Sequence, residues 1–536
     1  MSADPSGSTF GLADWLVVAG YFALLAGSGA YFAWRARRQR LANAADYFTA
    51  GHAMPVWAVA VSILATAQSA ATFTGVPEQS YTGNLAYLAT NLGGLVAAFI
   101  LAGVFIPAYY RRNVTTPYQL LETRLGRGAR LATSWAYMIG RVFASGSRVF
   151  VGAIPVSIAL FGDADAGHMA IAVSAFMAFG IVYTLAGGIT SVIWTDVLQV
   201  CVYLGAAVLA VVLLASRVEA PWGEVLSAVR EGGPGGASKL ELFPSGFRDD
   251  GTFHWGQSIN LVTILTGFVL LTLASHGADQ DLVQRMLTTK SASRGSWSVI
   301  SGVLVGIPAV ALFLVWGLLL WVLYQRPELM SRPPAVVPKS SDVVVLTYIL
   351  HELPAGAAGL MIAGVMAAGP AGINAGLNSM ASTFVTDVYR HRVPGRSEAH
   401  YLRVSRLAVV GWGVVLGAFA LLCIPWKEAA GQTIIDFVLG VMNFAYAGLL
   451  GVFLTALFTR RGNSVSAVAA LVAGALTVLA MRPEVWRLAG RWWTGDPAFE
   501  AGFSLAWPWH LITASAVATA VCCLGRSPAS AKEGGS

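Results

Sequence analysis

Thirteen long apolar runs separated by short polar segments dominate the sequence and restrict what the chain can fold into. Most runs approach or exceed the roughly 20 residues that an α-helix needs to cross the hydrocarbon core of a bilayer. Hydrophobic residues make up 56% of the 536 residues and charged residues only 11%, whereas about 25% of an ordinary soluble protein is charged. The pattern predicts an all-α integral membrane protein with about thirteen transmembrane helices.

We number the runs from zero, so that the second run is helix 1. They are Gly11–Trp34, Met54–Pro77, Leu85–Tyr110, Leu131–Phe161, Met169–Gly187, Ile189–Ser216, Gln257–His276, Ser298–Tyr324, Ala355–Asp387, Leu407–Ile424, Ile434–Phe458, Ser464–Met481 and Trp507–Leu524. The first run follows a segment without a basic n-region or an obvious cleavage site, so we expect a retained helix and not a signal peptide.

Composition and motifs also argue against several classes of function. The formal net charge is +7, but the basic residues are scattered over short loops, so we expect no nucleic-acid partner. The cysteines lie in apolar runs without metal-ligand spacing, and no catalytic motif appears in a suitable context. We therefore expect a protein that is not an enzyme and has no cofactor. Its partners would be a small-molecule solute and the lipid bilayer, and the sequence does not set the oligomeric state.

The distribution of Lys and Arg predicts the orientation of the chain. With the N-terminus outside, the cytoplasmic loops hold most of the loop arginines and lysines, including Arg35–Arg40, Arg111, Arg112, Arg285, Lys290, Arg294 and Arg390–Arg406. The outer loops, including the long segment Arg217–Trp255, hold fewer. We expect a multi-pass protein of the cell membrane, a bacterial inner membrane, with its C-terminus in the cytoplasm.

Two runs contain features that interrupt helices. Helix 1 ends in AQSAATFTGVPEQSY, and the run Ala355–Asp387 contains GPAGINAGLNS. Glycine and proline interruptions at membrane depth are tolerated where the backbone lines a protected cavity, and transporters bind their solutes at such breaks. A kinked packing helix is the alternative for each run taken alone.

Asp196, Arg141 and Arg148 lie inside apolar runs, where a charge is costly and invites a functional hypothesis. Asp196 could coordinate a cation, take up a proton, or cap its helix near the lipid headgroups. Arg141 and Arg148 are seven residues apart and share one helix face, where a guanidinium could bind a carboxylate. Their alternative role is structural, through snorkelling or bonds to free carbonyls.

Four segments carry a recognisable pattern. They are ADYFTAGHAMPVWAVAVSILATAQSAATFTGVP at helix 1, GGITSVIWTDVLQV at Gly187–Val200, DQDLVQRMLTTKSA at Asp279–Ala292 and NAGLNSMASTFVTDVYR at Asn374–Arg390. Together these segments resemble the sodium:solute symporter family. The resemblance covers roughly residues 10–460, with the segments in matching order.

The resemblance implies a LeuT-like core of two inverted five-helix repeats, the architecture of the APC superfamily. The expected parts are residues 1–50, an N-terminal helix and linker; 51–220, the first repeat; 221–254, an extracellular loop; 255–460, the second repeat; and 461–536, two further helices and a tail. Solute would bind between broken helices 1 and 6.

The resemblance also implies a sodium site between helices 1 and 8. The matching backbone carbonyls belong to Ala65, Gln68 and Ala368, with Asp196 close by. The family's two adjacent serines are replaced here by Ala371 and Gly372, which leaves a poorer oxygen cage for a hard cation.

These observations predict a cation-coupled symporter, with sodium as the expected coupling ion, for a small organic anion such as a carboxylate. Arg148 and Arg141 are its candidate anion ligands, and Gln68, Thr72 and Thr74 in the helix-1 break are candidate hydrogen-bond donors. The alternatives are a proton-coupled carrier, in which Asp196 titrates, an uncoupled carrier, and a transporter-like membrane sensor.

Overall fold

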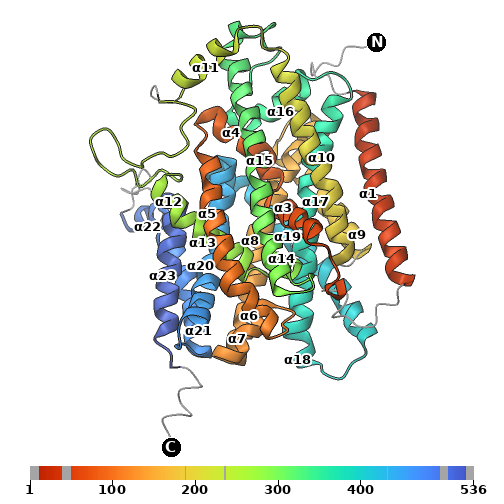
Figure 1. Cartoon of the computed structure of the whole chain (residues 1–536), viewed down its shortest axis with the longest axis vertical. Coiled ribbons are helices and arrows are strands. Elements are labelled where there is room, and N and C mark those ends of the chain that lie inside the picture. The colour runs from red at the N-terminus through yellow and green to blue at the C-terminus, as the bar shows by residue number, and fades with distance from the viewer. Residues whose placement is uncertain are drawn as a thin grey trace, which may run out of the picture.

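The computed structural model describes residues 11–38, 50–186, 189–233, 237–430, 433–494 and 505–526. Within these ranges the chain is helical, and its β-structure is limited to isolated bridges such as Val218 with Met330. Long helices stand side by side, with α1 on one flank and α20, α21 and α23 on the other (Figure 1).

A helix forms at each of the thirteen expected runs. They are α1 (Leu12–Arg38), α3 (Val56–Ala67) with α4 (Ala70–Thr82), α5 (Ala86–Ile100) with α6 (Ile106–Arg111), α8 (Arg127–Phe161), α9 (Ala166–Ala186), α10 (Ile189–Ala215), α12 (Leu261–Leu265) with α13 (Gly267–Leu273), α15 (Ala292–Gln325), α17 (Ala357–Thr383), α19 (Glu398–Ala430), α20 (Ile434–Phe458), α21 (Ser464–Ala480) and α23 (Trp507–Cys523).

Length and composition alone support a smaller number of membrane spans. In the described ranges, nine helices are long and apolar enough to cross a membrane, and the number rises to eleven if each of two bent pairs is one span. The two bent pairs are α3 with α4, and α21 with α22 (Pro483–Thr494). The helices α9 and α23 occupy the remaining two expected runs.

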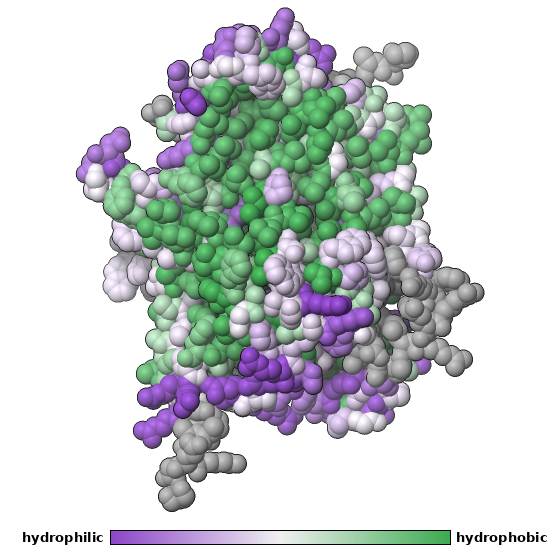
Figure 2. All heavy atoms as spheres, viewed as in Figure 1, coloured by the Kyte–Doolittle hydropathy of each residue, from purple (hydrophilic) through white to green (hydrophobic). Residues whose placement is uncertain are grey.

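Short helices lie between the spans, and the apolar pattern did not predict them. They include α7 (Pro117–Leu125), α11 (Trp222–Glu231), α14 (Gln280–Met286), α16 (Val344–His351) and α18 (Arg390–Arg392). In Figure 1, α11 and α16 lie at the upper end of the molecule and α7 and α18 at the lower end. Figure 2 shows a broad hydrophobic belt between hydrophilic surfaces at these two ends, as expected for a protein that spans a bilayer.

The expected break in helix 1 is present. The helices α3 and α4 meet at an angle of 67°, and Gln68 and Ser69 between them have extended backbones. The Ser69 N–H donates to the Thr72 hydroxyl over 3.3 Å, which helps to start α4. The polar and small residues of this segment therefore form an interruption inside the helix bundle.

The interruption expected in the run Ala355–Asp387 does not form. The helix α17 continues through the GPAGINAGLNS segment to Thr383 and is followed by a π-helical turn, Phe384–Tyr389. Small residues in this helix instead allow close packing, because Gly364 lies against Ala206 and Phe73. The second irregular span is helix 6, where α12 ends at Thr266 and a π-helical turn, Ala274–Ala278, follows α13.

Candidate functional site

A cavity of about 180 Å³ lies beside the helix-1 break. It is lined from α3 and α4, from α5, α8, α13, α15 and α20, and from the π-helical turn after α13. Four predicted solute residues line it together: Gln68, Thr72, Arg141 and Arg148. Thr74 is not among the lining residues, and its hydroxyl donates to the Ala70 carbonyl over 3.1 Å.

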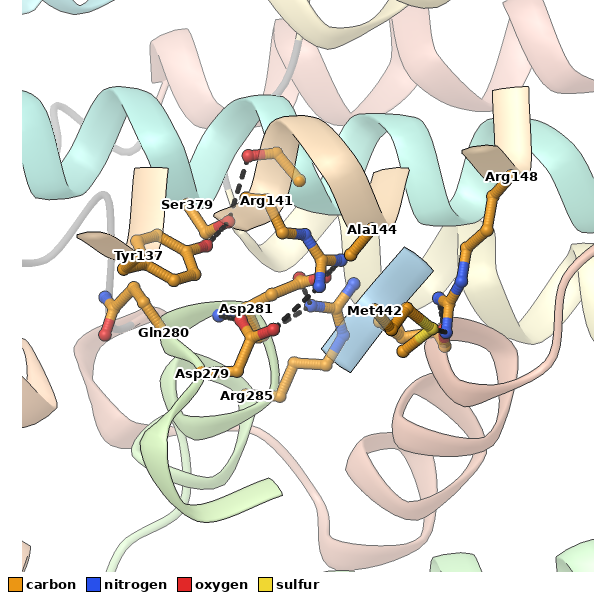
Figure 3. A network of polar contacts seen from close by, with 12 residues as sticks. Tyr137, Arg141, Ala144, Arg148, Asp279, Gln280, Asp281, Arg285, Ser379 and Met442 are labelled. Carbon is orange, nitrogen blue, oxygen red and sulfur yellow. Dashed lines mark hydrogen bonds and ion pairs between the residues drawn. The ribbon is translucent and has the colours of Figure 1, made fainter. Parts of the chain in front are cut away.

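Arg148 faces this cavity without a carboxylate partner in the described part of the chain. Its Nη1 donates to the Thr66 carbonyl over 3.0 Å, and its Nη2 lies 3.8 Å from the sulfur of Met442. Among the described residues, its Nε has no hydrogen-bond partner. Figure 3 shows Arg148 beside Met442, away from the carboxylates of Asp279 and Asp281.

Arg141 lies on the same helix but is neutralised. Its Nη1 is 2.8 Å from Asp279 Oδ2, and its Nη2 contacts Asp281 Oδ2. The Tyr446 hydroxyl also donates to Asp279 over 2.9 Å. Two carboxylates thus compensate this guanidinium, and both project from the start of α14 (Figure 3).

Arg285 extends these contacts to helices 1 and 5. Its Nη1 lies 2.7 Å from Asp281 Oδ1, its Nη2 lies 3.2 Å from Asp196 Oδ2, and its Nε donates to the Ser62 hydroxyl over 2.9 Å. Ser62 in turn donates to Asp196. We therefore name Arg141, Asp279, Asp281, Arg285 and Asp196 the buried ionic network.

This network corrects one sequence-based expectation. Arg285 was placed among the cytoplasmic loop residues, but it belongs to α14 and is 1% exposed, because α14 folds inward against α3 and α17. Asp196, for which the sequence left several roles open, is buried and has Arg285 as its ion-pair partner.

The residues predicted around sodium lie on α3, α10 and α17. Ala65, Gln68 and Ala368 line a second, small cavity of about 10 Å³. Gly372 is buried, and no heavy atom lies within 4 Å of the position that a Cβ would take there. The side chain of Ala371 lies outside the described part of the structure.

The model of the sodium:solute symporter family matches residues 47–474, which is most of the chain. The chain belongs to the sodium:solute symporter family. The symporter is 29% identical over 482 residues to a sodium/sialic acid symporter of Proteus mirabilis, covering 88% of this chain and 90% of the relative. It is 30% identical over 478 residues to a sodium/sialic acid symporter of Aliivibrio fischeri, covering 88% of both proteins.

Solved structures support the LeuT-like fold of the symporter. A sialic acid symporter solved in a substrate-bound outward-open state superimposes with a TM-score of 0.78 at 24% identity, over 96% of this chain and 97% of that chain. The nucleobase-cation-symport-1 transporter Mhp1 in a closed conformation superimposes with a TM-score of 0.54 at 16% identity, over 89% of this chain and 92% of that chain.

Sequence reasoning missed Asp279 and Asp281 as parts of this site. Both lie in the DQDLVQRML segment, which carried the family resemblance but was taken for a loop. Asp281 and Arg285 are four residues apart, a spacing that brings opposite charges together on a helix. That spacing was the available signal for an ordered α14.

Proposed function

We propose that this chain is a secondary active transporter that carries a small carboxylate-bearing anion across the membrane, coupled to sodium. The observation that carries the proposal is Arg148, a guanidinium at a cavity beside a broken helix, with no carboxylate partner among the described residues. A cation in such a place lacks a counter-ion, and a solute carboxylate would supply it through charge-assisted hydrogen bonds.

The lining of the cavity supports this assignment. Arg141 is compensated by Asp279 and Asp281, so Arg148 is the guanidinium available to a solute. Gln68 and Thr72 add polar groups from the two sides of the helix-1 break. The volume of about 180 Å³ is more than ten times the roughly 10–15 Å³ that one water needs, so the cavity can hold a small organic solute.

The relatives support both parts of the proposal, because those from Proteus mirabilis and Aliivibrio fischeri are named sodium/sialic acid symporters. In the same proposal, residues 51–220 and 255–460 form the two inverted repeats. The end of the chain that precedes α1 lies outside, and the end that follows α23 lies in the cytoplasm.

Uptake into proteoliposomes tests the proposal. The purified protein is screened with radiolabelled monocarboxylates, dicarboxylates and acidic sugars under an inward sodium gradient. Arg148→Gln should abolish uptake of the transported anion, and Arg148→Lys should retain part of it, because Lys keeps the charge but loses the bidentate geometry. Arg230→Gln, at an exposed arginine, is the matched control. Full uptake by Arg148→Gln would contradict the assignment.

A proton-coupled or uncoupled carrier is the second candidate. The missing hydroxyls at Ala371 and Gly372 favour both forms of this candidate. The ion pair of Asp196 with Arg285 favours only the uncoupled form, because a guanidinium beside the carboxylate opposes its protonation. The same proteoliposomes distinguish the candidates when sodium and proton gradients are imposed separately. Uptake that follows only the sodium gradient supports the first candidate, and uptake that follows only the proton gradient, or neither, supports the second.

A further inference from the structure

A cavity of about 380 Å³ lies at the turn between α18 and α19, outside the proposed anion site. The helix α18 is at the lower end of the molecule (Figure 1). The residues that line the cavity are Gly395, Arg396, Ser397, Ala399, His400 and Arg403. Two arginines and a histidine thus line a polar cavity, and none of the lining residues is acidic.

The two arginines at this cavity have no carboxylate partner. Among the described residues, neither Arg396 nor Arg403 forms an ion pair. The nearby carboxylate of Glu398 is held by Arg390, whose Nη2 lies 2.8 Å from Oε1 and 2.6 Å from Oε2. The cavity therefore has an excess of positive charge and suits an anion.

The other polar groups at the cavity fit a phosphate. Ser397 Oγ accepts from the His400 N–H over 3.3 Å and can donate its own hydroxyl hydrogen to an anion. His400 Nε2 lies 2.9 Å from the Tyr389 hydroxyl, which fixes the orientation of the imidazole. Guanidinium groups bind phosphate oxygens through two parallel hydrogen bonds. Arginine, serine and histidine side chains together therefore match the donors that a phosphate requires.

The face of α19 that carries Arg403 becomes apolar and exposed further along the helix. Leu407, Val410 and Val414 follow Arg403 at intervals of four, three and four residues, so all four share one face. Leu407 is 72% exposed and Val414 is 64% exposed. In a protein that spans a bilayer, such an apolar surface contacts acyl chains. Side chains on a helix point towards its N-terminus, so the Arg403 side chain leads from this surface towards the cavity.

We propose that Arg396, Ser397 and Arg403 bind the phosphate of an anionic phospholipid, whose acyl chains pack on Leu407 and Val414. Basic pockets at the membrane surface recognise lipid headgroups in this way. Phosphatidylcholine carries a cation next to its phosphate, and the two arginines repel that cation. Phosphatidylglycerol has no such cation and is the preferred lipid. This site lies on the outer surface of the helix bundle and is separate from the solute cavity.

Thermal unfolding of the purified full-length protein in a nonionic detergent tests the proposal, because a bound lipid stabilises the folded state by mass action. Dioctanoylphosphatidylglycerol should stabilise wild type at a lower concentration than dioctanoylphosphatidylcholine. Arg396→Gln and Arg403→Gln should each raise the half-saturating concentration of phosphatidylglycerol about fivefold, the effect of one basic residue at an anionic lipid surface. Arg294→Gln, at an exposed arginine outside the cavity, is the matched control and should bind like wild type.

Three results would overturn the proposal. Equal stabilisation by the two lipids would show that the site does not select an anionic headgroup. An equal loss of binding in Arg294→Gln would show a general effect of surface charge. Glycerophosphoglycerol, the same headgroup without acyl chains, should not stabilise wild type, and stabilisation equal to that by the lipid would show a site for a soluble anion. Unfolding temperatures without lipid show that each variant is folded.

Discussion

Arg285 and Asp196 form an ion pair inside the helix bundle, with Nη2 and Oδ2 3.2 Å apart and both side chains 1% exposed. The pair connects α14, between the helix-6 and helix-7 spans, to α10. Ser62 on α3 contacts both partners. Three segments that are far apart in sequence are thus held at one buried point.

Breaking this pair from one side should destabilise the protein strongly. Arg285→Gln leaves the buried Asp196 without its counter-ion, and such changes cost about 3–5 kcal/mol. Asp196→Asn leaves Arg285 paired with Asp281 and should cost less. The double variant should lose less than the sum of the two single losses, because both charges are removed together. Thermal unfolding of the four proteins in one detergent measures this coupling, and additive losses would show that the pair contributes nothing specific.

Removing one carboxylate from Arg141 should change the affinity for an anionic solute. Asp279→Asn retains an oxygen for the Asp281 N–H at the start of α14 but removes a charge next to Arg141. Arg141, then compensated by Asp281 alone, lies at the same cavity as Arg148. Its guanidinium should lower KM for the transported anion about tenfold, the effect of one charge-assisted hydrogen bond. The measurement is concentration-dependent uptake, with Glu398→Gln at an exposed ion pair as the control. An unchanged KM would show that Arg141 does not contribute to solute binding.

Gly317 should tolerate no larger side chain. A Cβ at this position would lie 2.1 Å from the Pro77 carbonyl oxygen, so α15 and α4 touch through their backbones. Gly317→Ala must push α4 away from α15, and we expect a loss of about 2 kcal/mol or more, within the range for overpacked cores. Gly205→Ala, where nothing lies within 4 Å, should be neutral or slightly stabilising. Equal unfolding temperatures for the two variants would refute the close contact.

Lys239 should stabilise α4, the second half of helix 1. Its ammonium donates to the carbonyls of Ser80, Tyr81 and Gly83 over 2.8–3.0 Å at the end of α4. A cation that satisfies the last carbonyls of a helix is favourable, so Lys239→Met should cost about 2 kcal/mol, the range of hydrogen bonds made by charged groups. The check is thermal unfolding, in which Lys339→Met, at an exposed lysine, should match wild type.

The sequence was sufficient to predict the spans and the main break, because both depend on local composition. Apolar length predicts a helix. The small and polar residues from Gln68 to Thr74 predict the break, because they are poorly suited to an uninterrupted buried helix. The same reasoning failed for the run Ala355–Asp387, since glycine and proline also occur in unbroken membrane helices, where neighbouring helices compensate for them.

The partners of the charged residues could not be predicted in the same way. Arg141 and Arg148 looked equivalent in sequence, being seven residues apart on one helix face. Only the tertiary structure shows that α14 brings Asp279 and Asp281 to Arg141. Arg148 is left with the Thr66 carbonyl. Such contacts join residues more than 80 positions apart, and a single sequence carries no record of them.

The hydrogen bond from Arg148 to the Thr66 carbonyl attaches the proposed anion ligand to the last turn of α3. If the proposed solute carboxylate draws the guanidinium towards itself, the same side chain will pull on α3, the first half of helix 1. Binding of the proposed solute would therefore be coupled, through this one side chain, to the angle between α3 and α4. The empty and the solute-bound transporter would then begin the conformational change with different angles between α3 and α4.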